Sequence, residues 1–160
     1  MAKHRLSRHP SSIFEVNMEY FDYRYRVIYA DTDRMGITYY ANYLKWFEAA
    51  RTEYFRALGF PYTECEKKGI YLPVAEAHVN YIAPSTYDDD VTVRTSVAKI
   101  GNSTLRFEYQ VMNTKTRIPL ATGYTLHVFV NKDMRPCRVP VEIKEVVKEC
   151  VLLKKRCRCK

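Results

Sequence analysis

The residues best suited to chemistry lie within one stretch of 23 residues, from Tyr29 to Arg51. Two carboxylates, Asp31 and Asp33, follow a segment rich in aromatic and β-branched residues, and Gly36 comes three residues after Asp33. A long segment without glycine or proline then begins near residue 41. This order predicts a strand, a tight turn that carries carboxylates, and the N-terminus of a helix.

Such an arrangement suits the hydrolysis of an activated acyl group. Backbone N–H groups at the start of the helix, near residues 38–42, form a site for negative charge. They would stabilise the oxyanion of a tetrahedral intermediate, while an upstream carboxylate attacks the carbonyl carbon or activates water. A thioester fits this chemistry well, because its leaving thiolate needs little protonation.

The same stretch resembles the motif of the 4-hydroxybenzoyl-CoA thioesterase family of acyl-CoA thioesterases, which have the hotdog fold. The residues that carry the resemblance are Tyr29, Asp31, Thr32, Asp33, Gly36, Tyr39, Tyr40, Tyr43, Phe47, Glu48 and Arg51. The segment from Tyr81 to Asp90 is also similar to the strand–turn–strand that follows the helix in this family. The resemblance covers about residues 20–143 and leaves out both ends of the chain.

The resemblance implies roles for particular residues. Asp33 matches the catalytic aspartate of the family, and the backbone N–H of Tyr40 matches the amide that polarises the thioester carbonyl. Many relatives carry histidine where this chain has Tyr40, so any proton transfer by that histidine is absent here. Asp31 matches a residue that is usual in one branch without being the accepted catalyst. A second branch uses a carboxylate on the helix, which makes Glu48 the alternative carboxylate.

The resemblance also indicates where the substrate binds. Gly36, Tyr39 and Tyr43 are the expected substrate-binding residues near the start of the helix, and the tyrosines suit an aromatic or a short aliphatic acyl group equally. Lys99 and Arg106 flank a turn close to the place where relatives use a basic loop, so they are the expected contacts of the CoA phosphates. No metal ion and no other cofactor is implied.

Several residues of the motif also have simple structural interpretations. Two aspartates in a turn are usually solvated or act as helix caps, and such a role is favoured for Asp31. Glu48 and Arg51, spaced i and i+3, are expected to pair on the helix surface. Asp88 to Asp90 are expected to form a turn without chemistry. His127 lies in an expected strand and fits a buried structural histidine.

The elements that must position these residues are one long helix and an antiparallel sheet. Residues 41–58 place apolar side chains on one face of an α-helix. Shorter helices are expected near residues 64–68 and 141–153. A first strand is expected at residues 20–30, before the helix. The four strands expected after it, residues 71–83, 90–100, 104–114 and 120–131, have short connections, which require antiparallel pairing. The fold class is therefore α+β, with about five strands around one central helix, and the outer face of the sheet is expected to need cover from an oligomer.

The net charge of +8 lies in the two ends of the 160-residue chain. Residues 1–13 carry three basic and no acidic side chains, and residues 148–160 carry six basic side chains and one acidic one. The intervening residues carry 17 of each sign. A nucleic-acid-binding domain usually has its basic patch on the folded body, so specific binding of nucleic acid is not expected.

The chain is expected to form one domain with two extensions. These are a flexible basic extension over residues 1–18, a hotdog thioesterase domain over residues 19–143, and a helix end with a basic tail over residues 144–160. The five cysteines show no C-x-x-C motif, which favours reduced thiols. No run approaches the roughly 20 apolar residues of a membrane span, and no secretory signal is recognisable. A cytoplasmic location is therefore expected.

The family resemblance implies an acyl-CoA substrate and a homodimer or homotetramer with its active site at the subunit interface. Two alternatives remain open from the sequence. The basic ends would suit docking of an acidic acyl carrier protein, which makes an acyl-carrier-protein thioesterase the first alternative. The second is a non-catalytic hotdog module that binds acyl-CoA, although such a module has no need for Asp33.

Overall fold

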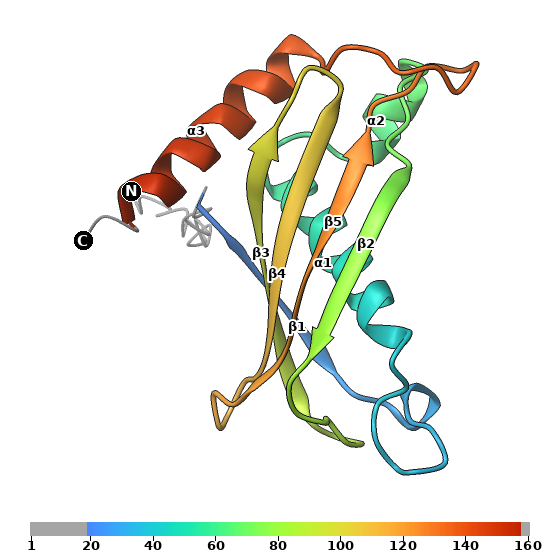
Figure 1. Cartoon of the computed structure of the whole chain (residues 1–160), viewed down its shortest axis with the longest axis vertical. Coiled ribbons are helices and arrows are strands. Elements are labelled where there is room, and N and C mark those ends of the chain that lie inside the picture. Colours follow the sequence, from blue (N-terminus) through green and yellow to red (C-terminus); the bar gives the residue numbers. More distant parts are fainter. Residues whose placement is uncertain (1–18, 158–160) are drawn as a thin grey trace, which may run out of the picture.

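The computed structural model describes residues 19–157, with side chains as far as residue 152. A five-stranded antiparallel sheet, ordered β1-β3-β4-β5-β2, curves around one long helix (Figure 1). The strands are β1 (Phe21–Arg26), β2 (Val74–Tyr81), β3 (Asp90–Ile100), β4 (Thr104–Asn113) and β5 (Pro119–Val128). The helices are α1 (Asn42–Ala57), α2 (Tyr62–Lys67) and α3 (Val141–Cys157). In the part of the chain described, no helix has the length and apolar character needed to cross a membrane.

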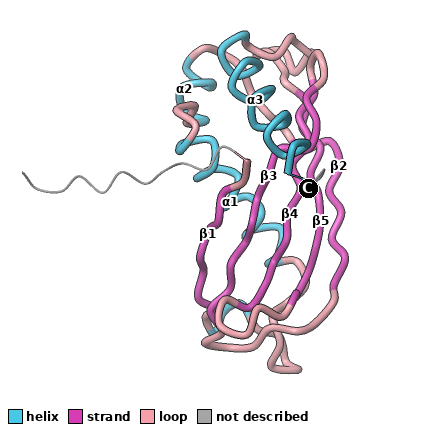
Figure 2. The backbone as a smooth tube through the Cα atoms, turned by 90° about the vertical axis from the view of Figure 1, so that its left-hand side faces the viewer, coloured by secondary structure: helices cyan, strands magenta, loops and turns pink. Residues whose placement is uncertain are grey.

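The two ends of the sheet differ in what they carry. Figures 1 and 2 place α2 and α3 at one end, called here the α2 end. The loop between β1 and α1 lies at the opposite end, called here the loop end. Helix α1 runs along the sheet from the loop end to the α2 end, so the N-terminus of α1 lies beside the loop that carries the two aspartates.

The hydrophobic core lies between α1 and the inner face of the sheet. Strand β4 alternates buried and more exposed side chains, as a strand with one covered face does. Phe47 of α1 stacks on Tyr109 of β4, with ring centroids 4.1 Å apart. The buried residues of α1 are Asn42, Tyr43, Trp46, Phe47, Ala50, Arg51, Tyr54 and Phe55. Their helical spacing is what turns one face of α1 toward the sheet.

Gly123 of β5 allows α1 to approach the sheet closely. A Cβ atom at this position would lie 2.4 Å from the carbonyl oxygen of His78 and 2.6 Å from a ring carbon of Phe47. We therefore expect Gly123→Ala to lower the free energy of unfolding by about 1–3 kcal/mol, because the packed core must shift to make room. Urea unfolding measures this. Thr122→Ala on the neighbouring position is the control, expected within about 0.5 kcal/mol of wild type; equal effects would contradict close packing at Gly123.

All the expected elements are present, with boundaries that differ by up to four residues. β2 and β5 are shorter than expected, and three other boundaries differ for physical reasons. β1 ends at Arg26 instead of near residue 30, because Tyr29–Asp31 form a short 3-10 helix. α2 begins at Tyr62, directly after Pro61, and the ring of Tyr62 stacks on Phe55. α3 ends at Cys157 instead of near residue 153, and positions 147 and 150 of this helix are buried. The folded body therefore continues into residues 144–150; the expected basic extension over residues 1–18 lies outside the described residues.

The outer face of the sheet carries ion pairs beside β1, and the expectation that this face needs cover from an oligomer stays a prediction. Arg94 of β3 forms a two-pronged ion pair with Asp22 of β1, with both hydrogen bonds 2.7 Å long. Arg26 of β1 lies 3.4 Å from a carboxylate oxygen of Asp90. Charged groups on these outward positions remain hydrated, and such partly exposed pairs add little stability.

Candidate active site

Asp33 opens a tight turn at the loop end. Its backbone N–H donates to the carbonyl of Ile37 at 2.9 Å, and its carbonyl accepts from the N–H of Gly36 at 3.0 Å. Gly36 has a φ of +79°, which glycine adopts without the strain that other residues incur. One oxygen of the half-buried carboxylate accepts from the N–H of Met35 at 2.8 Å. Within residues 19–157, the second carboxylate oxygen accepts no hydrogen bond, so it is available to a substrate.

Asp31 has a structural role, because it joins the loop to both β1 and α1. Its carboxylate accepts from the hydroxyl of Tyr25 at 2.8 Å and from the N–H of Ile28 at 3.0 Å. Its backbone carbonyl accepts from the N–H of Tyr39 at 2.7 Å and from the side chain of Asn42 at 2.8 Å. Burial, together with the hydrogen bond to Asp31, raises the pKa of Tyr25 to about 12. Asp31 therefore holds the loop in place, whereas the carboxylate of Asp33 is available to a substrate.

The start of α1 presents fewer N–H groups than the sequence suggests. The N–H of Thr38 donates to Ser85, and the N–H of Asn42 donates to the carbonyl of Tyr39. Among the backbone groups described, those of Tyr40 and Ala41 have no acceptor. These two N–H groups lie at the positive end of the helix dipole. They are the ones that can polarise a carbonyl oxygen.

An apolar cavity of about 310 Å³ lies beside Tyr40. The hydroxyl of Tyr81 donates to the carbonyl of Tyr40 at 2.9 Å, and the ring of Tyr81 meets Tyr43 edge-on. Tyr43 is buried and belongs to the core, whereas Tyr39 is exposed and lies against the ring of Tyr40. The cavity is lined by Ile37, Thr38, Tyr40, Tyr43, Tyr81, Ile82, Ala83 and Pro84. Its size and apolar walls suit part of an acyl group.

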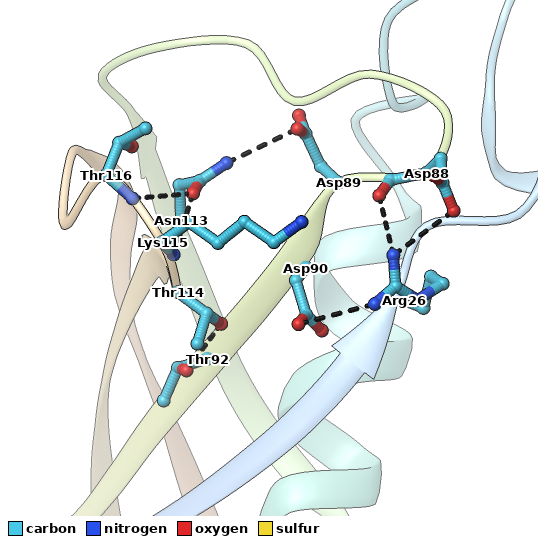
Figure 3. Close-up of polar contacts among 9 residues, drawn as sticks. All are labelled: Arg26, Asp88, Asp89, Asp90, Thr92, Asn113, Thr114, Lys115 and Thr116. Carbon is cyan, nitrogen blue, oxygen red and sulfur yellow. Dashed lines mark hydrogen bonds and ion pairs between the residues drawn. The ribbon is translucent and has the colours of Figure 1, made fainter.

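The turn at Asp88–Asp90 supports the cavity from the sheet side. Arg26 forms ion pairs with the first and third carboxylates, at 3.2 and 3.4 Å, and the side chain of Asn113 donates to the second at 3.3 Å (Figure 3). The second carboxylate also accepts from the N–H of Thr86 at 2.8 Å. Thr86 pairs with Ile37 across an isolated β-bridge. These carboxylates therefore fix the turn against the Asp33 loop.

Lys99 and Arg106 lie far from Asp33 within one chain. They face each other across β3 and β4 at the α2 end of the sheet. Asp90 begins β3 at the loop end, and nine residues of strand span roughly 30 Å. The guanidinium of Arg106 lies 3.7 Å above the ring of Tyr124. One chain therefore does not bring these two bases to the Asp33 loop.

The expected surface pair of Glu48 and Arg51 is wrong, because Arg51 is buried. No carboxylate in the described chain lies within 4.0 Å of its guanidinium. Its Nη1 instead donates to Nε2 of His127 at 3.1 Å. Nδ1 of His127 lies 3.1 Å from the carbonyl of Leu72, and Nε2 also lies 2.8 Å from the hydroxyl of Thr125. Donation from Nδ1 to the carbonyl leaves Nε2 as the acceptor for the other two groups.

The sequence contained a signal for the burial of Arg51. This residue follows Phe47 by four positions and precedes Tyr54 by three, so helical spacing places it within the apolar face of α1. The charge of the residue favoured a surface interpretation. Glu48 itself is exposed on α1, as expected of a solvated carboxylate.

Burial of His127 makes the stability of the fold depend on pH. Burial and then the positive charge of Arg51 lower the pKa of His127 to about 4, whereas an unfolded histidine titrates near pH 6.5. Between these values the unfolded chain binds a proton that the folded chain excludes, so the free energy of unfolding decreases as pH falls. We expect this group to contribute a loss of about 2 kcal/mol between pH 7 and pH 5.

Urea unfolding of wild type and His127→Gln at both pH values isolates this contribution. Glutamine retains an acceptor for Arg51 and a donor for Leu72 but does not titrate. The variant is expected to show the smaller decrease between pH 7 and pH 5. The same decrease in both proteins would show that His127 is not the group responsible.

Comparison with known proteins identifies the family. The family model described as the thioesterase-like superfamily matches residues 27–150. The chain belongs to this superfamily. A thioesterase of this superfamily, the acyl-CoA thioesterase YbgC of Haemophilus influenzae, is 35% identical over 125 residues, covering 78% of this chain and 91% of that protein.

A second relative and a solved structure agree with this assignment. A protein of Aquifex aeolicus described as a putative esterase is 35% identical over 129 residues, covering 81% of this chain and 98% of that protein. The structure of the DHNA-CoA thioesterase of Staphylococcus aureus superposes with a TM-score of 0.81 at 33% identity, covering 86% of this chain and 94% of that one. The expected hotdog fold and the expected class of enzyme, a thioester hydrolase, are confirmed.

Proposed function

We propose that this thioesterase hydrolyses an acyl-CoA to a carboxylic acid and CoA, with Asp33 as nucleophile or general base and the N–H of Tyr40 as oxyanion donor. One observation carries the proposal: Tyr40, whose N–H has no acceptor among the described residues, lines an apolar cavity, and the available carboxylate of Asp33 lies in the loop that leads to it. The relatives named as acyl-CoA thioesterases support CoA as the carrier.

The residues would act in a simple order. The acyl group enters the cavity, and its thioester oxygen accepts a hydrogen bond from Tyr40, which makes the carbonyl carbon more electrophilic. In one route Asp33 attacks this carbon, CoA leaves as the thiolate, and water then hydrolyses the mixed anhydride. In the other route Asp33 takes a proton from a water molecule that attacks directly. Both routes give the same acid and CoA.

The exposed edge of β2 supports a dimer that completes the site. β2 is an edge strand, and every residue of it except Val79 is exposed. It carries no lysine or proline, the residues that commonly protect such edges from pairing. We propose that β2 pairs antiparallel with β2 of a second copy. Residues that face each other in such a pair point to the same side, so the two-fold axis passes through a residue. Pairing along the whole of β2 places this residue at the centre of the strand, at Ala77 or His78.

Either register brings opposite ends of the two chains together. Residues 71–73 of one copy come to lie opposite residues 81–83 of the other in one register and residues 83–85 in the other, and residues 82–84 line the cavity beside Tyr40. The α2 end of one subunit thus meets the loop end of its partner. This arrangement would place the end of the sheet that carries Lys99 and Arg106 beside the loop end of the partner.

The test is the release of CoA, followed with a thiol reagent, from short, long and aromatic acyl-CoAs. The same acyl groups carried on an acyl carrier protein form the comparison set. Turnover of at least one acyl-CoA is the expected result. Turnover confined to the carrier-protein substrates would favour that carrier instead, and binding without turnover of any thioester would contradict a catalytic role for this site.

A further inference from the structure

The backbone carbonyl of Tyr40, at the start of α1, accepts its hydrogen bond from the sheet. In a regular helix this carbonyl would accept from the N–H of Leu44, four residues later, but that N–H donates to the carbonyl of Ala41 at 3.2 Å. The hydroxyl of Tyr81, the last residue of β2, donates to the Tyr40 carbonyl instead, at 2.9 Å. A side chain of the sheet therefore completes the hydrogen bonding of the first turn of the helix.

The hydrogen bond from Tyr81 also fixes the direction of the Ala41 N–H. The carbonyl of Tyr40 and the N–H of Ala41 belong to one planar trans peptide unit and point in opposite directions, so holding the carbonyl holds the N–H. The preceding peptide unit is held in a similar way, because the carbonyl of Tyr39 accepts from the N–H of Asn42 at 2.9 Å. The N–H groups of Tyr40 and Ala41, which have no acceptor in the described chain, are therefore each aligned through the carbonyl of their own peptide unit.

The backbone angles of Ala41 indicate that these two N–H groups point the same way. The hydrogen bond between residues 39 and 42 closes a turn in which Ala41 is the third residue, with φ −69° and ψ −21°. Such angles at this position are those of a type I turn, in which both central residues are close to helical. Consecutive helical N–H groups at the start of a helix point back along its axis. One oxygen atom placed before the helix can therefore accept from both.

Tyr81 is well suited to hold this peptide unit. Its ring meets the buried Tyr43 edge-on, with centroids 5.3 Å apart, which restricts where the hydroxyl can lie. Partial burial raises the pKa of Tyr81, so its hydroxyl keeps its proton at neutral pH and remains a donor. A hydrogen bond to an amide oxygen also polarises the amide and makes its N–H a stronger donor. Tyr81 therefore both aligns and polarises the N–H of Ala41.

We propose that the N–H of Ala41 is a second oxyanion donor beside that of Tyr40, and that Tyr81 is the positioning residue that aligns it. This inference rests on the proposed function and adds a residue of β2 to its machinery. As the tetrahedral intermediate forms, the thioester oxygen gains negative charge and accepts from both N–H groups. Because these hydrogen bonds strengthen only as the charge develops, they lower the barrier without tightening the binding of the substrate.

Tyr81→Phe tests the positioning role, because it removes one oxygen atom and keeps the ring against Tyr43. Loss of a direct oxyanion donor costs roughly 100- to 1000-fold in kcat, and the loss here is indirect. We therefore expect kcat for the best acyl-CoA to fall about 5- to 30-fold, with KM within about 2-fold of wild type. Tyr20→Phe, whose ring lies under Arg94 outside the cavity, should leave both constants unchanged. An unchanged kcat in Tyr81→Phe, or a rise in KM alone, would contradict the proposal.

An ester bond in the backbone tests the N–H of Ala41 itself. Lactic acid incorporated in place of Ala41 by nonsense suppression replaces this N–H with an oxygen atom and keeps the methyl side chain. We expect kcat to fall about 100-fold. If Tyr81 acts through this N–H, adding Tyr81→Phe to the ester protein should lower kcat by a further factor of about 2 at most. Full multiplication of the two losses would show that Tyr81 acts by another route and would overturn its positioning role.

The outcomes separate this inference from the proposed function. Turnover by wild type, with kcat unchanged in both Tyr81→Phe and the ester protein, would overturn the inference and leave the thioesterase intact. Absence of turnover by wild type on every short, long and aromatic acyl-CoA would overturn both. Circular dichroism and urea unfolding show whether each protein is folded. Tyr81→Phe decides the question by its effects on kcat and KM even where the ester protein fails to fold.

Discussion

Asp33→Asn is expected to reduce kcat for the best acyl-CoA substrate by roughly 10³- to 10⁴-fold, while the protein remains folded. Asparagine retains a side-chain oxygen that can accept from the N–H of Met35, as Asp33 does at 2.8 Å, so the turn is preserved. Its amide can neither attack the carbonyl carbon nor accept a proton from water. CoA release measures the effect, and the circular dichroism spectrum with urea unfolding confirms that the fold is intact.

Two other carboxylates serve as controls for this result. Asp31→Asn disturbs the hydrogen bonds that hold the loop to Tyr25 and Ile28, so its main expected effect is a lower free energy of unfolding. Glu48→Gln changes an exposed carboxylate on α1 and is expected to leave turnover of benzoyl-CoA close to wild type. A collapse of turnover in Glu48→Gln, with activity retained in Asp33→Asn, would show that the helix carboxylate is the catalyst.

Labelled water distinguishes the two routes open to Asp33. In a single turnover in oxygen-18 water, nucleophilic attack forms a mixed anhydride, and hydrolysis at the aspartyl carbon leaves label in Asp33. Direct attack by water places the label in the product acid alone, as does hydrolysis of the anhydride at the acyl carbon, so label in Asp33 is the result that identifies nucleophilic attack. Mass spectrometry of the peptide that contains Asp33 reads the result.

The sequence predicted the catalytic region more sharply than the roles within it. The long run without glycine or proline located α1 to within a residue or two, and the change to period two located the strands. Asp31 and Asp33 could not be told apart from spacing, because both lie in the same turn. Their difference comes from tertiary partners: Tyr25 and Asn42 reach Asp31 from β1 and α1. Likewise, the backbone hydrogen bonds of Thr38 and Asn42 leave two candidate oxyanion donors at the start of α1, and the sequence does not show these bonds.

Arg51 and Lys99 show two different limits of the sequence. For Arg51 the helical spacing predicted a buried position, whereas the positive charge predicted an exposed one. The prediction from spacing was correct, because neutral His127 and a second cavity, which Arg51 lines, accommodate the guanidinium. For Lys99 the antiparallel order already implied the answer. β3 begins beside the loop end, so a residue near the end of β3 must lie at the α2 end. Only the proposed pairing of β2 with a second copy would bring this end of the sheet toward Asp33, so the β2 edge is the feature to test.

Placing lysine at both Ala77 and His78 is expected to produce a monomer that loses about 100-fold or more of its kcat/KM. Each allowed register puts one of these positions directly opposite its copy, where like charges repel. Both residues are exposed in β2, so the single chain is expected to fold normally. The loss of activity follows because a site shared between subunits is misaligned or absent in the monomer. Analytical ultracentrifugation and CoA release measure the two effects.

A control variant carries the same two added charges away from the edge of the sheet. Gln110→Lys with Thr63→Lys places them at exposed positions, and this variant should remain dimeric and active.

A variant of opposite charge tests the geometry of the pairing. A chain with glutamate at both Ala77 and His78 should also be monomeric, because its charges repel in the same way. Mixing the lysine and glutamate chains should restore dimers and turnover together, since opposite charges now face each other. Full activity in the lysine monomer would show that one chain holds the whole site, and a persistent, active dimer would show that the subunits associate through another surface.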